Sequence, residues 1–299
     1  MKSDTYQMVT DRICALLEQG IKPWAKPWVG AASSAWSGNN GKPYSLLNQM
    51  LLADPEKQYK TMEDLLADIR GEWITYKQAQ ERGGSVRKGE HGRRIVFFKS
   101  LEIKDEENEE NTHTVPFLTS YTVFHISQCD GIQQKYHLEG EDKLDFTGDD
   151  KADEVASGYI FREGITFRTQ KGDSAYYRPS EDLVVLPLPE QFVSEAEYYS
   201  TLFHELTHST GHPKRLNRLD AEAAFGREDY SREELVAEIG SASLCATLGI
   251  ENKDSFTNSA AYIANWLSAL RNDKRMIVWA ASRAEKAVRL ILNVEEAEA

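Results

Sequence analysis

The sequence predicts an α+β protein of two domains. A chain of 299 residues is longer than one typical domain. Its first half contains β-rich runs, whereas its last 40 residues carry apolar side chains at helical spacing. An acidic, polar segment over residues 139–154 separates the halves and predicts an interdomain linker. We therefore expect one domain over residues 1–138 and a second over residues 155–299.

The elements of the first half begin with a helix. Its apolar residues recur at helical spacing, at Met8, Val9, Ile13, Leu16 and Leu17. Further along, residues 95–101 and 115–126 form two β-rich runs. Between them, residues 104–111 contain no apolar side chain, which predicts a long hairpin with a polar tip.

The second half predicts a small sheet and several helices. A helix is expected directly after the linker, followed by strands over residues 165–169 and 183–186. Tyr176 and Tyr177 lie between these strands and can pair into the same sheet. Apolar residues at helical spacing between residues 262 and 291 predict the final helices.

The segment from His204 to His208 reads His-Glu-Leu-Thr-His, the H-E-x-x-H pattern of a zinc site on a helix. Residues four apart differ by about 40° around a helix axis, so both imidazoles face the same side. Two neutral imidazoles can bind one Zn²⁺, and Glu205 can then act as general base. Ser194 is a polar N-cap for this helix, and Gly211 predicts its end.

The residues after this motif exclude one class of zinc enzyme. Metzincins place a third histidine three residues after a glycine, but Lys214 occupies that position here. His212 is too close to His208 to continue the helical face past Gly211. We expect His212 at the surface or behind the ligands. If it were a fourth ligand, the zinc would be structural.

A second helix offers carboxylates for the missing ligand. Ser231 and Glu234 have the spacing of a capping box, which predicts the start of a helix there. Glu234 and Glu238 lie one turn apart among apolar residues, where carboxylates are costly unless they meet cations or a metal. One of them can ligate zinc, and the other can accept the N–H of a ligating histidine. Glu233 is expected on a solvated acidic face.

This arrangement resembles the Glu-zincins, in which a downstream helix supplies the third ligand. The resemblance implies that His204, His208 and Glu234 bind Zn²⁺ and that Glu238 holds a ligating histidine. It also implies an edge strand above the metal helix that binds an extended peptide. Tyr230 is a candidate for stabilising the oxyanion. The context over residues 203–212 and 233–240 is similar to the metallopeptidase-like domain of ArdC-type antirestriction proteins, which implies a zincin-like domain over roughly residues 150–299.

The front of the chain has a different composition. Residues 1–101 contain 15 Lys and Arg against 11 Asp and Glu, whereas the remainder contains 20 against 37. Four of the six tryptophans, Trp24, Trp28, Trp36 and Trp73, lie among these cations. Aromatic side chains beside cations are the usual means of binding single-stranded nucleic acid. A tryptophan-rich core with a solvated cationic face fits the composition equally well. The surroundings of Trp36 predict exposure, and those of Trp73 predict burial.

The order of five short motifs favours the DNA-binding interpretation. Trp24–Trp28, residues 41–48, residues 73–79, residues 84–90 and residues 95–98 follow one another in a series. This series resembles the N-terminal single-stranded-DNA-binding domain of the ArdC family, shared with part of certain plasmid-encoded primases. The chain departs from that pattern over residues 36–40, which lack the family's Pro-Arg-Asn. The resemblance implies a set of residues that face DNA: Trp24, Lys26, Trp28, Trp36, Lys42, Tyr44, Tyr76, Lys77, Arg87 and Lys88.

The remaining features bound the setting. No run of 18 apolar residues exists, and the N-terminus has no apolar signal core, so no membrane partner is expected. Cys14, Cys129 and Cys245 match no zinc or redox spacing and are typical of a reducing cytoplasm. The leading hypothesis is a single-stranded-DNA-binding antirestriction protein of a mobile element with a zinc metallopeptidase domain. The alternatives are a DNA-localised protease with a protein substrate, or a non-catalytic DNA binder with structural zinc.

Overall fold

The structure, a computed structural model, describes residues 4–21, 23–24, 35–59, 62–104, 112–136, 148–192, 194–219, 227–250 and 260–294. The described part of the N-terminal half contains these helices and strands: α1 (Thr5–Glu18), β1 (Ala35–Ser37), α2 (Leu46–Leu52), α3 (Met62–Ile69), β2 (Gly71–Ile74), α4 (Tyr76–Glu81), β3 (Ser85–Val86), β4 (Arg93–Lys104), β5 (Thr112–His125), the short 3₁₀ helix η1 (Ile126–Gln128) and β6 (Cys129–Asp130). The described part of the C-terminal half contains α5 (Gly148–Glu163), β7 (Thr166–Gln170), β8 (Tyr176–Arg178), η2 (Pro179–Glu181), β9 (Leu183–Pro187), η3 (Pro189–Gln191), α6 (Glu195–Ser209), α7 (Arg227–Thr247), α8 (Ala260–Asn272) and α9 (Met276–Leu292).

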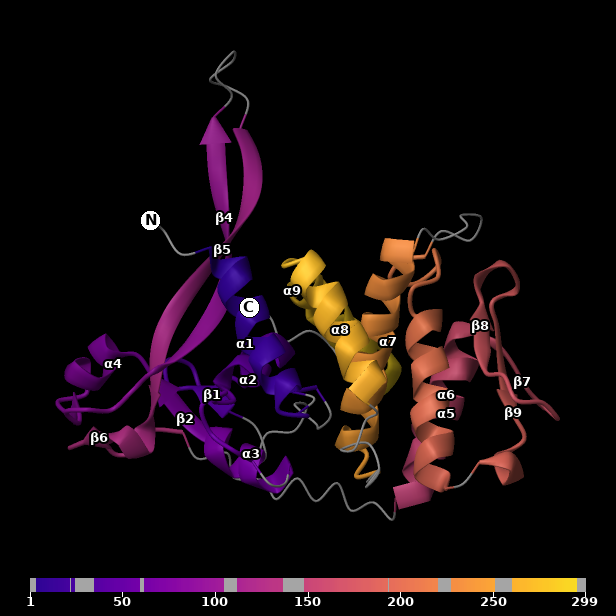
Figure 1. The fold of residues 1–299 in the computed structure, drawn as a ribbon, viewed down its shortest axis with the longest axis horizontal. Coiled ribbons are helices and arrows are strands. Elements are labelled where there is room, and N and C mark those ends of the chain that lie inside the picture. The colour runs from indigo at the N-terminus through magenta and orange to yellow at the C-terminus, as the bar shows by residue number, and fades with distance from the viewer. Residues whose placement is uncertain are drawn as a thin grey trace.

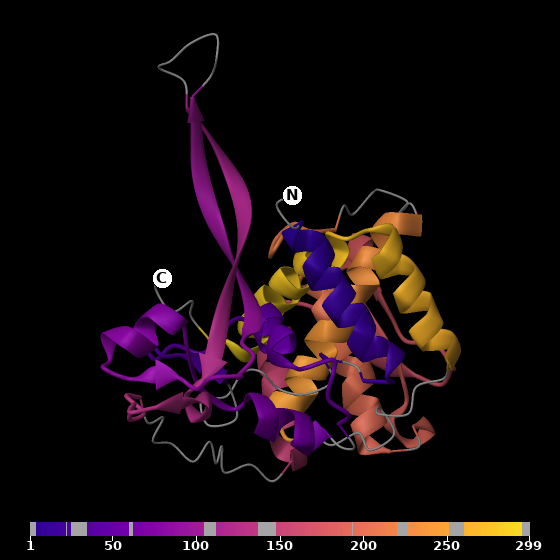
Figure 2. The same cartoon turned by 60° about the vertical axis from the view of Figure 1, so that its left-hand side comes forward.

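The N-terminal half is built on a four-stranded sheet in the order β1-β2-β5-β4. Strand β1 runs parallel to β2, whereas β5 pairs antiparallel with both β2 and β4. The β4–β5 pairing extends from Arg93 opposite Val123 to Lys104 opposite Thr112 and projects away from the body as a two-stranded ribbon (Figures 1 and 2). The predicted hairpin is confirmed, although its tip over residues 105–111 lies outside the described residues.

The C-terminal half places a small sheet beside a group of helices. The sheet has the order β7-β9-β8, with β7 parallel and β8 antiparallel to β9. Tyr176 and Tyr177 therefore pair into the same sheet as the two predicted strands, as expected. Strand β8 is an edge strand of this sheet and packs against α6. Helix α6 packs in turn on α7 (Figure 1).

The two halves share one hydrophobic core. Apolar residues of α1, α2, α3, β2, β4 and β5 cluster with residues of α7, α8 and α9. Polar contacts cross the same boundary, since the Thr10 hydroxyl donates to the Lys274 carbonyl at 3.0 Å. Lys274 also pairs with Asp4, and Arg271 with Glu18. The last two helices of the sequence therefore lie against the first half (Figure 2).

Two boundaries differ from the sequence-based expectation. Helix α5 begins at Gly148, so residues 148–154 of the predicted acidic linker are helical, and residues 139–147 lie outside the described residues. Helix α7 begins at Arg227, so Ser231 lies inside the helix and the predicted capping box at its start is wrong. Charged residues in a first helical turn can be mistaken for a polar linker because both are solvent-exposed.

The structure shows the state of the three cysteines and the apolar character of the helices. Cys14, Cys129 and Cys245 are all unpaired. Within the described parts of the chain, no helix combines the length and the apolar character needed to cross a bilayer.

Candidate metal centre

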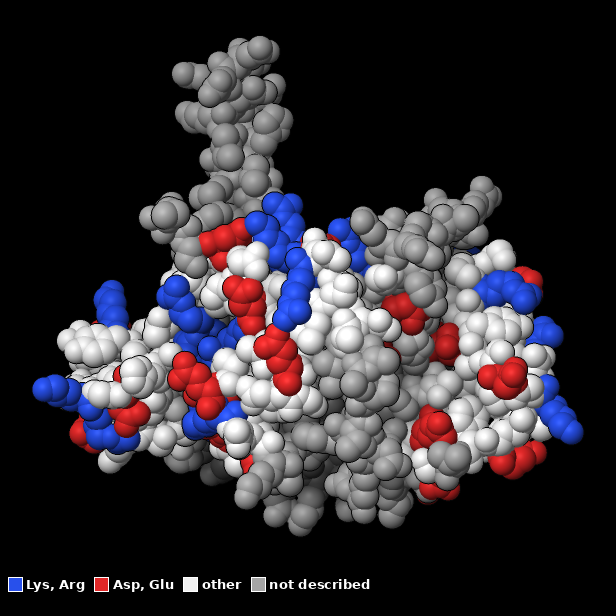
Figure 3. Space-filling model, viewed as in Figure 1, with Lys and Arg blue, Asp and Glu red and all other residues white. Residues whose placement is uncertain are grey.

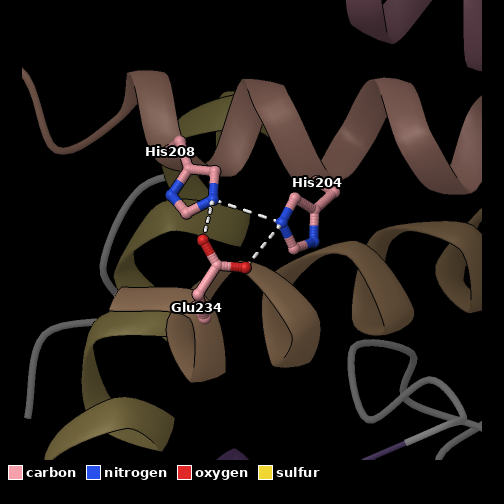
Figure 4. Close-up of side chains that lie close together, drawn as sticks. All are labelled: His204, His208 and Glu234. Carbon is pink, nitrogen blue, oxygen red and sulfur yellow. Dashed lines mark hydrogen bonds and ion pairs between the residues drawn. The ribbon is translucent and has the colours of Figure 1, made fainter. Parts of the chain in front are cut away.

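Helix α6 carries the H-E-x-x-H motif and has the ends that the sequence predicts. The Ser194 hydroxyl accepts a hydrogen bond from the Glu197 N–H at 3.2 Å, which caps the helix. The helix continues to Ser209, so His204 and His208 both lie in its second half, one turn apart. Both side chains point toward α7 (Figure 4). The predicted metal helix is confirmed as a helix.

Close packing of α6 and α7 brings Glu234 to the histidines. A Cβ on Gly240 of α7 would lie 2.6 Å from Cγ2 of Thr207 on α6, so only glycine fits at this crossing without displacement. Thr207 is fully buried and its hydroxyl donates to the Phe203 carbonyl at 2.7 Å, which fixes the contact. The small residue thus lets the backbones approach closely, with Glu234 almost two turns before it on α7.

The ligand atoms of His204, His208 and Glu234 all lie within 4.8 Å of one another. The two Nε2 atoms are 3.2 Å apart, and each lies 3.5 Å from a different carboxylate oxygen of Glu234 (Figure 4). Ligands about 2.0–2.1 Å from a tetrahedral zinc ion are separated from each other by roughly 3.3–3.4 Å. The three donors therefore have the spacing of ligands that share one ion.

The charges around this cluster favour a cation. Burial opposes the charged form of His208, but hydrogen bonds to Glu233 and Glu234 outweigh it and raise its pKa to about 9. Burial likewise opposes the charged form of Glu234, but hydrogen bonds from His204 and His208 hold its pKa well below the usual range. Buried carboxylates of this kind are stable only beside cations. The donor set and its electrostatics both fit a divalent metal.

A cavity of about 480 Å³ opens beside the cluster, with Glu205 in its wall. Glu205 is 7% exposed, and burial raises its pKa, against the opposing effect of His208 and His204. The backbone N–H of Tyr177 on edge strand β8 lies near the Glu205 carboxylate and acts against this rise in its pKa. Tyr176 and Tyr177 also line the cavity, so strand β8 forms one wall of the site.

Glu233, and not Glu238, is the carboxylate behind His208. Glu233 is 6% exposed and lies 3.4 Å from Nδ1 of His208, so the expected solvated position is wrong. Glu238 is half-buried, and within the described residues it makes no recorded hydrogen bond or ion pair with either histidine. The expected role of Glu238 therefore falls to Glu233.

Arg218 holds Glu233 in this position. Its Nε and Nη2 atoms donate to the two carboxylate oxygens of Glu233 at 3.1 and 2.8 Å. The same guanidinium donates to the Thr210 hydroxyl at 2.8 Å and to the Thr207 carbonyl at 3.0 Å. Because the arginine comes from a loop and the glutamate from α7, no local sequence pattern shows this pair. It orients His208 through a carboxylate, as is usual behind a metal ligand.

Exchanging the carboxylate of Glu233 or of Glu238 for an amide is expected to show which of the two supports metal binding. Glu233→Gln should weaken metal binding by about 10–100-fold, because the amide holds His208 less firmly. Glu238→Gln removes the same charge from the same helix and should leave the affinity within about twofold. Competition with a chromogenic zinc chelator measures both values. The opposite ranking would return the role to Glu238.

Two other predicted positions lie apart from the cluster. His212 is 8% exposed, so it is buried and not at the surface, and it does not belong to the group of convergent donors. Its Nδ1 accepts from the Lys214 N–H at 3.2 Å, so it stabilises the turn after α6. Tyr230 lies on helix α7, but its side chain is outside the described residues.

An ion-pair network missed by the sequence analysis fixes strand β8 above the helix. The Arg215 guanidinium is nearly inaccessible and binds both carboxylate oxygens of Asp182 and the Ser209 carbonyl at the end of α6. The Tyr177 hydroxyl donates to Asp182 at 2.9 Å. Burial opposes the charged Asp182, but Arg215 and Tyr177 outweigh it and lower its pKa. The network positions the Tyr177 backbone that contacts Glu205.

Most of the aromatic residues expected to face DNA are buried instead. Trp24 is fully buried, Trp36 is 6% exposed and Tyr44 is 7% exposed, so stacking of bases on these rings is excluded in this conformation. Trp73 is also buried, as predicted, and its Nε1 donates to the Ile69 carbonyl at 2.7 Å. The expectation that Trp36 is exposed is wrong, because β1 places it in the parallel pairing with β2. Trp28 and Lys26 lie outside the described residues.

The remaining expected residues are on the surface. These are Lys42, Tyr76, Lys77, Arg87 and Lys88. Lys77 pairs with Glu81 at 3.4 Å and Arg87 with Glu90 at 2.8 Å, so their charges are partly compensated. On the face drawn in Figure 3, cationic and acidic side chains are interspersed over the N-terminal half. The structure thus presents single cations here, without a continuous basic surface on that face.

Two exposed phenylalanines on strand β4 were not predicted. Phe97 is 44% exposed and Phe98 is 54% exposed, and adjacent strand residues point to opposite faces. Phe97 packs edge-on against Tyr121 at 5.8 Å between ring centroids. Exposed aromatic residues on consecutive strand positions leave apolar surface on both faces of the projecting ribbon.

Comparison with known proteins gives consistent results over both halves. Residues 154–283 match the zincin-like metallopeptidase family, and residues 3–124 match the N-terminal domain of anti-restriction factor ArdC. A DNA primase TraC from Escherichia coli is 34% identical over 99% of this chain, but the chain spans only 28% of that primase. The antirestriction ArdC protein from the R388 plasmid, for which crystal structures exist, is 38% identical in sequence to this chain.

That structure aligns over nearly the whole of both chains. In its metal-free form it covers 98% of this chain and 100% of its own, with a TM-score of 0.69. In its Mn(II)-bound form it covers 97% of each chain, with a TM-score of 0.70. With a zincin-like half, an ArdC N-terminal half and this full-length similarity, the chain belongs to the ArdC family of antirestriction proteins.

Proposed function

We propose that this antirestriction protein is a zinc-dependent peptidase joined to a single-stranded-DNA-binding half. The observation that carries the peptidase is the convergence of His204, His208 and Glu234 beside Glu205, in a cavity walled by an edge strand. The related ArdC structure, named for the R388 plasmid, supports an origin in a mobile element. The free cysteines support a cytoplasmic location.

Zinc is the ion that we propose for the cluster. Two imidazoles and one carboxylate are a donor set of catalytic zinc sites. A Mn(II)-bound crystal structure exists for the related R388 protein, which supports binding of a divalent ion in this family. When bound, such an ion supplies Lewis acidity, which polarises a carbonyl and makes water more acidic.

The residues of the chain supply the remaining chemistry. Glu205 lies beside His204 and His208 without belonging to the donor cluster, so its carboxylate is available to accept a proton from water. It then passes that proton to the leaving amine. The Tyr177 N–H lies near this carboxylate and favours its charged form, and Tyr177 and Glu205 both line the cavity.

Strand β8 supports a peptide as the substrate class. It is an edge strand of its sheet, so one side of its backbone has no strand partner among the described residues. Such an edge can pair with an extended chain. Because Tyr176 and Tyr177 of this strand line the cavity, a peptide paired with β8 would lie over the metal ligands.

The cluster also bears on the non-catalytic alternative. Structural zinc sites have four protein ligands, whereas catalytic sites keep one position open. Within the described residues, three donors converge and His212 is not among them. This supports catalysis over structural zinc. Hydrolysis of a proteome-derived peptide library by the zinc-loaded protein, read by mass spectrometry with and without chelator, tests the activity.

The proposal that the N-terminal half binds DNA rests on exposed aromatic residues and on cations in the same half. Tyr76, Phe97 and Phe98 are each 44–54% exposed on the N-terminal half. Exposed cations such as Lys42 and Lys88 belong to the same half. Aromatic rings bind single strands because the base faces are free there, whereas a duplex hides them.

Single-stranded DNA is expected to bind more tightly than duplex of the same length, with little sequence preference. Phe98→Ala or Tyr76→Ala should each weaken single-strand binding by roughly tenfold, since one stacked base contributes about 1–3 kcal/mol. Phe161→Ala is the matched control, because Phe161 is 89% exposed on α5 in the other half. Fluorescence anisotropy with labelled oligonucleotides measures the affinities. Equal affinity for duplex and single strand would defeat the stacking argument.

A further inference from the structure

A second cavity, of about 370 Å³, lies between helix α9 and the loop that follows α6. Its volume is within the range of small-molecule pockets, about 300–1,000 Å³. The lining residues come from two segments, namely Leu216, Asn217, Arg218, Trp279, Ser282, Arg283 and Lys286. Neither the peptidase site nor the N-terminal half accounts for this cavity.

The lining is cationic in a chain that is strongly acidic. Among the described residues, three cations and no Asp or Glu line the cavity, although the protein carries a net charge of −13. Arg218 is neutralised by Glu233 through two hydrogen bonds. Within the described residues, Arg283 and Lys286 have no recorded carboxylate partner. Two positive charges that form no ion pair with a described carboxylate therefore line one small space.

The Arg283 side chain is ordered by stacking on the ring of Trp279. Its guanidinium carbon lies 4.0 Å from the centroid of Trp279, within stacking distance. Its Nη1 also donates to the Trp279 carbonyl at 3.4 Å. Burial, together with the charge of Arg218, lowers the pKa of Arg283. The charge of Glu233 acts in the opposite direction without cancelling this effect, so a further anion beside Arg283 would stabilise its charged form.

The chemistry of the lining indicates which anion fits. Guanidinium, ammonium, hydroxyl and carboxamide groups are all hydrogen-bond donors, and Arg283, Lys286, Ser282 and Asn217 provide them here. A phosphate group offers several oxygens to such a set, and arginine matches its geometry through two parallel hydrogen bonds. We propose that this cavity is a phosphate-binding site, with Arg283 and Lys286 as its principal ligands.

A phosphate in this site would come from one of two sources. It can be a free phosphate or phosphomonoester, or one phosphodiester group of a DNA strand. Helix α9 also packs on α2 of the N-terminal half, where Glu285 accepts from the Leu46 N–H at 3.3 Å. A DNA strand bound by the N-terminal half would therefore reach the cavity by running along α9.

Calorimetric titration with inorganic phosphate, in a chloride buffer free of other oxyanions, tests the site in the full chain. Arg283→Gln with Lys286→Gln should weaken phosphate binding at least about tenfold, because two charge-assisted hydrogen bonds are lost. The control, Arg168→Gln with Lys171→Gln, removes the same charge from exposed positions in and after β7. It should change the phosphate affinity less than twofold. Phosphate bound at the metal contributes equally in all three proteins.

Three results would overturn the proposal: no phosphate binding by the native chain, equal weakening in both double variants, or acetate binding as tightly as phosphate. If the Arg283 variant does not fold, Lys286→Gln alone serves, since Lys286 is exposed on α9. Anisotropy with a labelled oligothymidine then identifies the source. A parallel loss of oligonucleotide affinity assigns the site to a DNA strand, and an unchanged affinity assigns it to free phosphate or a phosphomonoester.

Discussion

Glu205→Gln is expected to abolish peptide hydrolysis while the bound metal is retained. The carboxylate lies in the wall of the cavity beside His204 and His208 but is not one of the three convergent donors. An amide of the same shape keeps the packing and cannot accept the proton from water. General-base catalysis typically contributes about 10²–10⁴-fold, so kcat/KM should fall by that factor.

The control for this variant is Glu238→Gln, which removes one carboxylate from α7 without touching the cavity lining. It should retain near-native activity. Single-stranded-DNA affinity should be unchanged in both variants, because the exposed aromatic residues lie in the other half. If Glu205→Gln lost DNA binding, the two halves would be coupled, and the shared core along α7 and α9 would be the physical route. Full activity of Glu205→Gln would remove it from the mechanism.

Arg215→Met should cause the largest loss of stability. The Arg215 side chain is 1% exposed and its partner Asp182 is 13% exposed, so the pair is removed from water. Deleting one partner leaves a buried carboxylate with only the Tyr177 hydroxyl. Breaking a buried pair in this way costs about 3–5 kcal/mol. Arg178→Met is the matched control, because its pair with Glu181 is about half exposed and is worth at most about 1 kcal/mol.

The loss in Arg215→Met should depend on pH in a defined direction. In the native protein the pKa of Asp182 is lowered, so its stabilising effect is present above the unfolded value of about 3.9 and disappears as the pH falls below it. The difference between native protein and variant should therefore be largest near pH 7 and should shrink toward pH 3. Urea unfolding at both pH values measures it. A difference independent of pH would mean that lost packing, and not the ion pair, is responsible.

Local spacing was sufficient to predict helix α6 and the position of both histidines on one of its faces. The H-E-x-x-H motif fixes its own geometry, since four residues make about one helical turn. Glu234 was assigned through the resemblance to Glu-zincins, and the structure adds the close crossing of α6 and α7 at Gly240 that brings it to the histidines. The hairpin and the three-stranded sheet were also predictable, because strand periodicity and polar turns are local signals.

Long-range partners were not predictable in the same way. Glu233 and Glu238 lie on one helix, and only the position of Arg218 in a separate loop determines that Glu233 is the one behind His208. Exposure of Trp36 was inferred from polar neighbours, but pairing of β1 with β2 buries its ring. Likewise, the helical spacing of α8 and α9 shows an apolar face without showing that the face covers α1 and α2.

Metal analysis of the purified protein tests most directly whether His204, His208 and Glu234 together bind one divalent ion. Elemental mass spectrometry should find about one zinc ion per native chain, because the three donors make one site. The double variant His204→Ala, His208→Ala should be essentially free of metal, whereas His212→Ala should keep it. A double variant that retained the full complement of metal would contradict the assignment of the site.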